Sequence, residues 1–173
     1  MAYTYSKIAS VTVGSGGSSS IDFIAIPQNY TDLLVKFSLR NTRSSTGPGY
    51  GQILINASTS NFSSRSIYVN EDNTIGSNSR TNNYIMFSVA TDAQTANTFG
   101  SAELYIPNYS ASINKSMSFE ETSENNAILN VNRYLSAILW SNTAAINSIT
   151  ISAETNTFKQ YSTATLYGIK AEV

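Results

Sequence analysis

Apolar and polar residues alternate along this chain in short runs, the pattern of β-strands that bury one face. In "LLVKFSLR", residues 33–40, every second residue is apolar, so Val35 and Phe37 fall on one face and Lys36 on the other. Eleven further runs read as strands: "KIASVTVG", "SIDFIAIP", "GQILINA", "RSIYVN", "NYIMFSV", "SAELYIP", "KSMSFEE", "AILNVNRY", "LSAILWSN", "NSITISAE" and "TATLYGIKAEV". The pattern therefore predicts about a dozen strands, with Phe37 in the core.

The segments between these runs are rich in residues that favour turns. Residues 71–83 are one such segment, predicted as a turn because Asn, Ser and Gly dominate it. The best helix candidate is Thr91–Asn97, which is short and polar. Short antiparallel strands at this spacing predict an all-β fold, an antiparallel β-sandwich that is jelly-roll-like, formed by residues 1–173 as a single domain.

The last strand runs almost to the end of the chain, which suggests that it lies inside a sheet. In a two-sheet sandwich the terminal strands are often central and adjacent. Ala164 and Leu166 would then share one face of this strand, and Tyr167, Ile169 and Ala171 the other. Because both faces are partly apolar, we expect one to meet the core and the other a second subunit in a homo-oligomer, with three chains the expected number. The alternative is that Tyr167 and Ile169 are simply exposed.

Composition then narrows the function. The chain has no Cys and no His, which removes thiolate chemistry, His-based metal sites and the Ser-His-Asp triad. Charged residues make up 12% of the chain, whereas 28 Ser, 18 Thr and 19 Asn supply most of its polarity. The ten cations are scattered, so we expect no nucleic-acid partner. No apolar run is long enough to span a membrane, and "MAYTYSKIASVTV" contains no secretory signal pattern.

Carboxylates are the remaining catalytic candidates. Glu120 and Glu121 are adjacent on a predicted strand, so they point to opposite faces and cannot cooperate directly. Glu103 and Glu120 could meet across a sheet, which leaves a carboxylate-pair glycan hydrolase as a remote alternative. We predict that the chain is not an enzyme and has no catalytic, cofactor or metal site.

Tyrosine is abundant for so polar a chain, with eleven residues, and suits interfaces because it combines an apolar ring with a polar tip. The alternative for each Tyr is that it closes an end of the sandwich with its hydroxyl bonded to the backbone. Residues 1–6 are a candidate N-terminal arm that could grip a partner, or a frayed terminus. The predicted interface residues are Tyr3, Tyr5, Tyr105, Tyr109, Trp140, Tyr167 and Ile169.

Several strings are similar to a class of structural proteins of tailed bacteriophages. They are "KIASVTVGSGGSSSIDFIAIPQNYTDLLVKFSLRNTR", "LYIPNYSASINKSMSFE", "LWSNTAAINSITI" and "STATLYGI". The resemblance extends from Lys7 to Lys170 and contains no chemical motif, so it carries over no catalytic residue.

The resemblance implies a virion protein that is assembled in the cytoplasm of the bacterial host. Proteins of this class serve as capsid decoration (cement) proteins or as parts of tails and fibres. We expect a capsid decoration protein that binds and stabilises the assembled capsid, with the major capsid protein or other virion proteins as partners. The alternative is a tail-fibre or receptor-binding domain that recognises host surface glycan.

Overall fold

The computed structural model describes residues 3–45, 49–69, 72, 74–124 and 132–171. These residues form strands and turns, with no helix among them. The strands are β1 (Tyr3–Thr12), β2 (Ser20–Phe23), β3 (Asp32–Asn41), β4 (Gly49–Ile55), β5 (Phe62–Val69), β6 (Ile75–Asn82), β7 (Ile85–Thr91), β8 (Gly100–Ile106), β9 (Lys115–Ser123), β10 (Asn132–Trp140), β11 (Ile149–Ala153) and β12 (Thr163–Ala171). The predicted all-β fold is confirmed.

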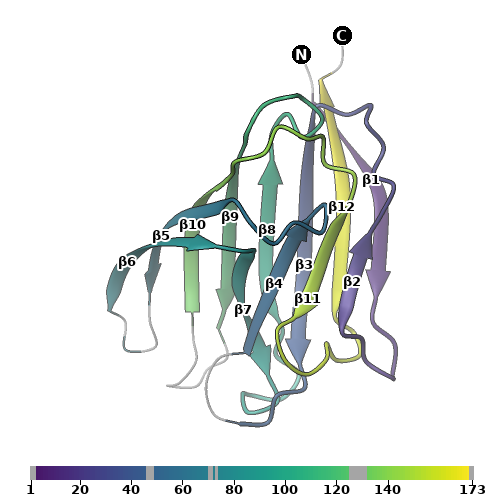
Figure 1. Cartoon of the computed structure of the whole chain (residues 1–173). Helices are drawn as coiled ribbons and strands as arrows, with labels where there is room; N and C mark the ends of the chain where they lie inside the picture. The colour runs from purple at the N-terminus through teal and green to yellow at the C-terminus, as the bar shows by residue number, and fades with distance from the viewer. Residues whose placement is uncertain (1–2, 46–48, 70–71, 73, 125–131, 172–173) are drawn as a thin grey trace.

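The described strands form two layers (Figure 1). The large sheet has the order β1-β12-β3-β8-β9-β10-β5-β6, and the small sheet the order β2-β11-β4-β7. All pairings are antiparallel except a short parallel one between β3 and β7, which links the two sheets. The architecture is thus an antiparallel sandwich, as predicted. It has eight strands in one layer and four in the other. A jelly roll arranges eight strands as two Greek keys.

The core lies between the two layers and is centred on three aromatic rings. Phe37 of β3 and Phe119 of β9 come from the large sheet, and Phe87 of β7 comes from the small one. The ring centre of Phe37 lies 5.0 Å from that of Phe87 and 6.2 Å from that of Phe119. Phe37 and Val35 are buried while Lys36 is exposed, so the predicted phase of this strand is confirmed.

The C-terminal strand β12 lies between β1 and β3, as predicted, and Ala164 and Leu166 are buried in the core. The arm predicted at residues 1–6 is wrong for its described part. Tyr3, Tyr5 and their neighbours belong to β1, where Tyr3 is opposite Ala171 and Tyr5 opposite Ile169. The backbone of this segment is therefore committed to the sheet and is not a free arm.

The helix candidate Thr91–Asn97 is wrong: the segment forms turns around a buried guanidinium group. Arg40 of β3 donates to Asp92 Oδ1 at 3.1 Å. It also donates to the main-chain carbonyl oxygens of Gln94 and Thr95 in this segment and of Thr98 just after it, at 2.7–3.2 Å. A helix would bind these carbonyl oxygens internally, so the turns that orient them toward Arg40 replace it.

The structure also corrects two strand boundaries. Residues 71–83 contain strand β6, which the sequence analysis assigned to a turn. The two runs 127–134 and 135–142 contribute to a single described strand, β10, and residues 125–131 lie outside the described part of the chain. After Ile75, strand β6 is polar on both faces, so it carries no apolar alternation by which a buried strand is recognised.

Candidate functional site

The large sheet extends beyond the small one, and this leaves a groove along one flank of the sandwich. Strand β7, an edge of the small sheet, packs against β8 and β9, whereas β10, β5 and β6 follow farther along the large sheet. Figure 1 shows β5 and β6 curving around this flank. Side chains from β4, β5, β6, β7, β9 and β10 line a cavity of about 70 Å³ between them.

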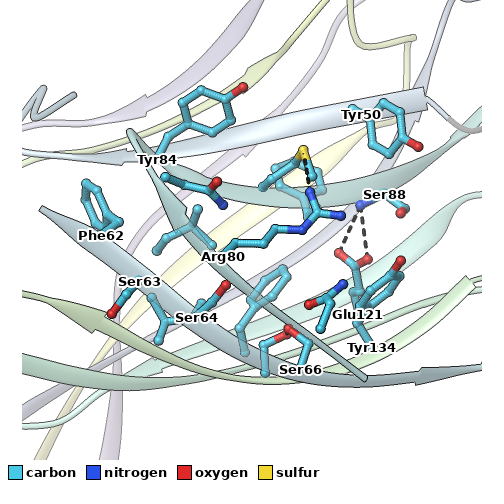
Figure 2. A pocket seen from close by; sticks show the side chains of 18 residues that line it. Tyr50, Phe62, Ser63, Ser64, Ser66, Arg80, Tyr84, Ser88, Glu121 and Tyr134 are labelled. Atoms are coloured by element: carbon cyan, nitrogen blue, oxygen red, sulfur yellow. Dashed lines mark hydrogen bonds between the residues drawn. The ribbon is translucent and has the colours of Figure 1, made fainter. Parts of the chain in front are cut away.

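The lining of this groove mixes polar with apolar side chains, where a sandwich interior would be mainly apolar. Five serines and two asparagines contribute, together with the rings of Tyr50, Tyr84 and Tyr134. Figure 2 shows Phe62 at one end of the groove and Glu121 with Tyr134 at the other. The groove therefore offers many hydrogen-bonding groups beside aromatic rings.

Glu121 is the carboxyl group of the groove, and it is buried. Both of its oxygens accept the backbone N–H of Ser88 in β7, at 3.0 and 3.1 Å (Figure 2). Burial raises the pKa of Glu121 to about 8, and the hydrogen bond from Ser88 only partly offsets that effect. At neutral pH the group is therefore mainly protonated and offers an O–H donor as well as acceptors.

Two further side chains of the groove, both from β6, have unused hydrogen-bonding capacity. The Oδ1 atom of Asn78 is buried and has no hydrogen-bond partner among the described residues. The guanidinium group of Arg80 contacts the thioether sulfur of Met86 at 3.7 Å, and sulfur is a weak acceptor. Figure 2 shows the Arg80 side chain reaching along the groove toward Ser88 and Glu121.

Three of the predicted interface residues lie together on the opposite, outer face of the large sheet. Tyr105 and Tyr167 flank Leu34, which is the cross-strand partner of both. The hydroxyl group of Tyr105 donates to Asp32 at 2.7 Å, and Ile169 pairs with Asp32 in the ladder. Ile169 is buried within the chain itself, so the prediction that it needs a second subunit to cover it is wrong.

Tyr5 is 60% exposed on this outer face, opposite Ile169, and the backbone of Tyr3 pairs with that of Ala171. Tyr105 and Tyr167 are half-buried, so these two residues and Tyr5 keep part of their side chains accessible to a partner.

Two predicted interface residues are core residues instead. Tyr109 is fully buried, and its hydroxyl group donates to the backbone carbonyl oxygen of Pro27. This is the alternative considered for each Tyr, a ring that closes the end of the sandwich. Trp140 is also buried and stacks on Phe62, with ring centres 6.0 Å apart and planes 13° apart. Trp140 faces inward because it lies two residues from the buried Ile138, and alternate residues of a strand share one face.

The outer face of β10, β5 and β6 carries exposed apolar side chains that the sequence analysis did not single out. Leu135 and Ile67 are direct cross-strand partners and are 53% and 57% exposed. Ile75, at the start of β6, is 78% exposed, and Leu139 is also exposed. We call these four residues the outer apolar patch. The same strands place serines and Tyr134 on their inner face, so the usual burial pattern is reversed here.

The carboxylates do not form a catalytic pair in the groove. Glu120 and Glu121 point to opposite faces of β9, as predicted: Glu120 is exposed and Glu121 buried. Glu103 and Glu120 do meet as direct cross-strand partners on the outer face, and Lys36 forms an ion pair with Glu103 at 2.9 Å. Among the residues that line the groove, Glu121 is the single carboxyl group, whereas glycoside hydrolysis of the usual kind uses two.

Comparison with known proteins adds no assignment. The sequence matches no family model and no curated protein. Within the described part of the chain, no helix is long and apolar enough to cross a membrane.

Proposed function

We propose that this chain is a non-enzymatic structural protein of a tailed-bacteriophage virion, and that it binds the assembled capsid as a decoration (cement) protein. The resemblance of its sequence to such proteins supports a place on the particle. The observation that carries a binding role is the outer apolar patch, because a folded chain exposes neighbouring Leu and Ile side chains at a cost in solubility.

The patch has the properties that attachment to a protein shell requires. Ile67 and Leu135 lie on regular strands of a sheet, so they present a fixed surface and lose little conformational freedom on binding. Complete burial of such a side chain contributes about 1.5–3 kcal/mol. Strand β6 pairs only with β5 among the described strands, so its free edge adds backbone donors and acceptors beside the patch.

The attachment that we propose is apolar and not electrostatic, since 12% of the residues are charged and their net charge is -1. Increasing the salt from about 0.1 M to 1 M shortens the screening length from about 10 to 3 Å, which weakens contacts between exposed charges. A contact made by Ile67, Leu135 and a strand edge persists under the same change. Particles are therefore expected to keep the protein through a wash in molar salt.

We also propose that the chain acts as a homo-oligomer, with three copies the expected number, because trimers match the local three-fold positions of an icosahedral lattice. The accessible side chains of Tyr5 and Tyr167 offer a surface for contacts between copies, at the opposite end of the large sheet from the patch. Light scattering of the purified protein tests this part. A mass of 18.7 kDa at micromolar concentration would contradict it.

The attachment itself is tested with particles that lack this protein. Purified chain is mixed with them or with unassembled capsid subunits, and bound protein is measured after sedimentation. We expect binding to the assembled shell, and loss of most of that binding in the double variant Ile67→Ser, Leu135→Ser. The control is Ile24→Ser, which removes an even more exposed isoleucine outside the patch. Equal binding of the double variant and the control would rule out attachment through the patch.

A second candidate function is a tail-fibre or receptor-binding domain that recognises host surface glycan. The specific observation in its favour is the groove, whose tyrosines and hydrogen-bonding side chains suit a sugar. Copy number distinguishes the two functions, because a decoration protein is present in many copies per particle and a fibre tip in few. Quantitative gel analysis of purified particles measures it.

A further inference from the structure

We propose that the groove between β7 and the strands β9, β10, β5 and β6 binds one pyranose ring of a glycan, with Glu121 and Asn78 bonding its hydroxyl groups. The site goes beyond attachment to a shell. It also does not depend on that attachment, because it lies on the inner face of the strands whose outer face carries the apolar patch. A sheet that is bound through its outer face leaves this groove accessible from the other side.

The first argument is the unused hydrogen-bonding capacity of buried groups. The Oδ1 atom of Asn78 is buried without a partner among the described residues, which costs free energy unless a ligand or water satisfies it. The carboxyl group of Glu121 accepts one backbone N–H, from Ser88, and the structure shows no acceptor for its own proton within the described part of the chain. Sugar hydroxyl groups can donate to Asn78 and accept from Glu121, because each hydroxyl is both donor and acceptor.

The second argument is what the groove excludes. An apolar ligand would leave the Oδ1 atom of Asn78 and the carboxyl proton of Glu121 without partners in a buried site, which is costly. A divalent cation is usually held by oxygen ligands that include ionised carboxylates, whereas the groove has one carboxyl group, which is mainly protonated at neutral pH. A nucleic acid needs several cations, and Arg80 is the single cation of the lining. A polyhydroxylated ring satisfies the polar groups without demanding charge.

The third argument is the aromatic surface beside these polar groups. Tyr50, Tyr84 and Tyr134 come from β4, from the β6–β7 connection and from β10, so they border the groove from several sides. The ring of Tyr134 is held by stacking on Tyr68, with ring centres 5.2 Å apart. Rigid tyrosine rings provide the flat apolar surface on which the C–H face of a sugar packs. Arg80 remains free to bond a ring hydroxyl group, or the carboxylate of an acidic sugar.

The experiment measures binding by saturation-transfer difference NMR and titration calorimetry. The probes are methyl α-D-glucopyranoside and methyl β-D-galactopyranoside as neutral rings, with D-glucuronate as an acidic one. We expect at least one probe to bind, and Asn78→Ala and Glu121→Ala to weaken it about tenfold or more, the effect of losing a hydrogen bond to a buried group. Asn114→Ala, at an exposed position outside the groove, is the control. Circular dichroism shows whether each variant is folded.

The variant Glu121→Gln keeps the proposal testable if Glu121→Ala fails to fold. Glutamine retains an acceptor and a donor but does not ionise. The wild type should lose affinity between about pH 7 and 9 as Glu121 ionises, and Glu121→Gln should not. The other titratable groups that face the groove are Arg80, Tyr50, Tyr84 and Tyr134, and burial raises the pKa of Tyr134, so it stays protonated in this range.

Several outcomes would overturn the site. Absence of binding by all three probes at millimolar concentration would do so, as would binding that Asn78→Ala and Glu121→Ala leave unchanged. A third such outcome is that glucuronate is the one probe that binds and that Arg80→Gln alone abolishes its binding. The binding would then be an ion pair with a surface cation and not a sugar site. These measurements use isolated protein, so their result is independent of the capsid-binding assay. Sugar binding can be absent while capsid binding is found, and capsid binding can be absent while sugar binding is found.

Discussion

Ser88 in the small sheet and Glu121 in the large sheet are joined by one backbone N–H that both carboxyl oxygens accept, at 3.0 and 3.1 Å. This contact ties the edge strand β7 to β9 at the point where the small sheet ends. It places a carboxyl group in a buried position that favours its protonated form.

The first prediction follows from that position. Glu121 ionises at about pH 8 in the folded chain but near 4.5 when unfolded. Between these two pH values the folded state binds one more proton than the unfolded state. The unfolding free energy therefore falls as the pH rises, by at most about 1.4 kcal/mol per pH unit from this group. The fall ends once the pH exceeds the pKa of the folded state. Glu121→Gln should lack this component. Denaturant titrations of both proteins across the window measure the difference, and parallel pH profiles would contradict it.

The second prediction concerns the aromatic centre of the core. Phe37→Ala removes a ring that packs against Phe87 and Phe119, so it should lower the unfolding free energy by about 3–5 kcal/mol. Lys36→Ala, on the other face of β3, loses only an exposed ion pair with Glu103 and should cost less than about 1 kcal/mol. Chemical denaturation measures both values. Similar losses in the two variants would mean that the outer face is also covered.

The third prediction concerns the buried guanidinium group of Arg40. Arg40→Ala removes a buried donor from the carbonyl oxygens of Gln94, Thr95 and Thr98, and a loss of about 3–5 kcal/mol in unfolding free energy is expected. Lys7→Ala removes a cation from an exposed position and is the control. Thermal unfolding followed by circular dichroism compares them. A variant Arg40→Ala as stable as the control would show that the turns hold their shape without Arg40.

The fourth prediction concerns the close approach of strand β12 to the ring of Tyr30. A Cβ atom added at Gly168 of β12 would lie 2.4–2.5 Å from ring atoms of Tyr30. Gly168→Ala therefore has to displace the ring or the strand, and should destabilise the fold by about 1–3 kcal/mol. At Gly14 the same Cβ atom meets nothing within 4 Å, so Gly14→Ala serves as the matched control. A neutral effect of Gly168→Ala would indicate that Tyr30 moves aside freely.

The fifth prediction concerns residues 1–6, which the sequence analysis predicted as a candidate arm. Because Tyr3–Ser6 pair with Ala171–Gly168, deleting residues 1–6 should expose one edge of β12 and lower the thermal unfolding midpoint. A free arm would leave the midpoint unchanged. Differential scanning calorimetry of the truncated and full chains distinguishes the two, and an unchanged midpoint would restore the arm hypothesis.

The sequence by itself determined the class of fold and most of the strands. Alternation in β3 and β8 is strong because each of these strands has one face on the core, so Val35, Phe37 and Leu104 could be assigned to the interior from local pattern alone. The position of β12 between two neighbours was also predicted, because the terminal strands of a two-sheet sandwich are often central.

Only the tertiary structure decided the flank where the large sheet extends past the small one. There the apolar residues Ile67 and Leu135 face outward and the polar lining faces inward, so alternation indicates a strand but not which face is buried. It also decided that Trp140 and Tyr109 are core residues, and that Glu121 lies in a groove while Glu120 lies in solvent. The reason is physical: a strand's period fixes which side chains share a face, whereas the packing of distant strands fixes what that face meets.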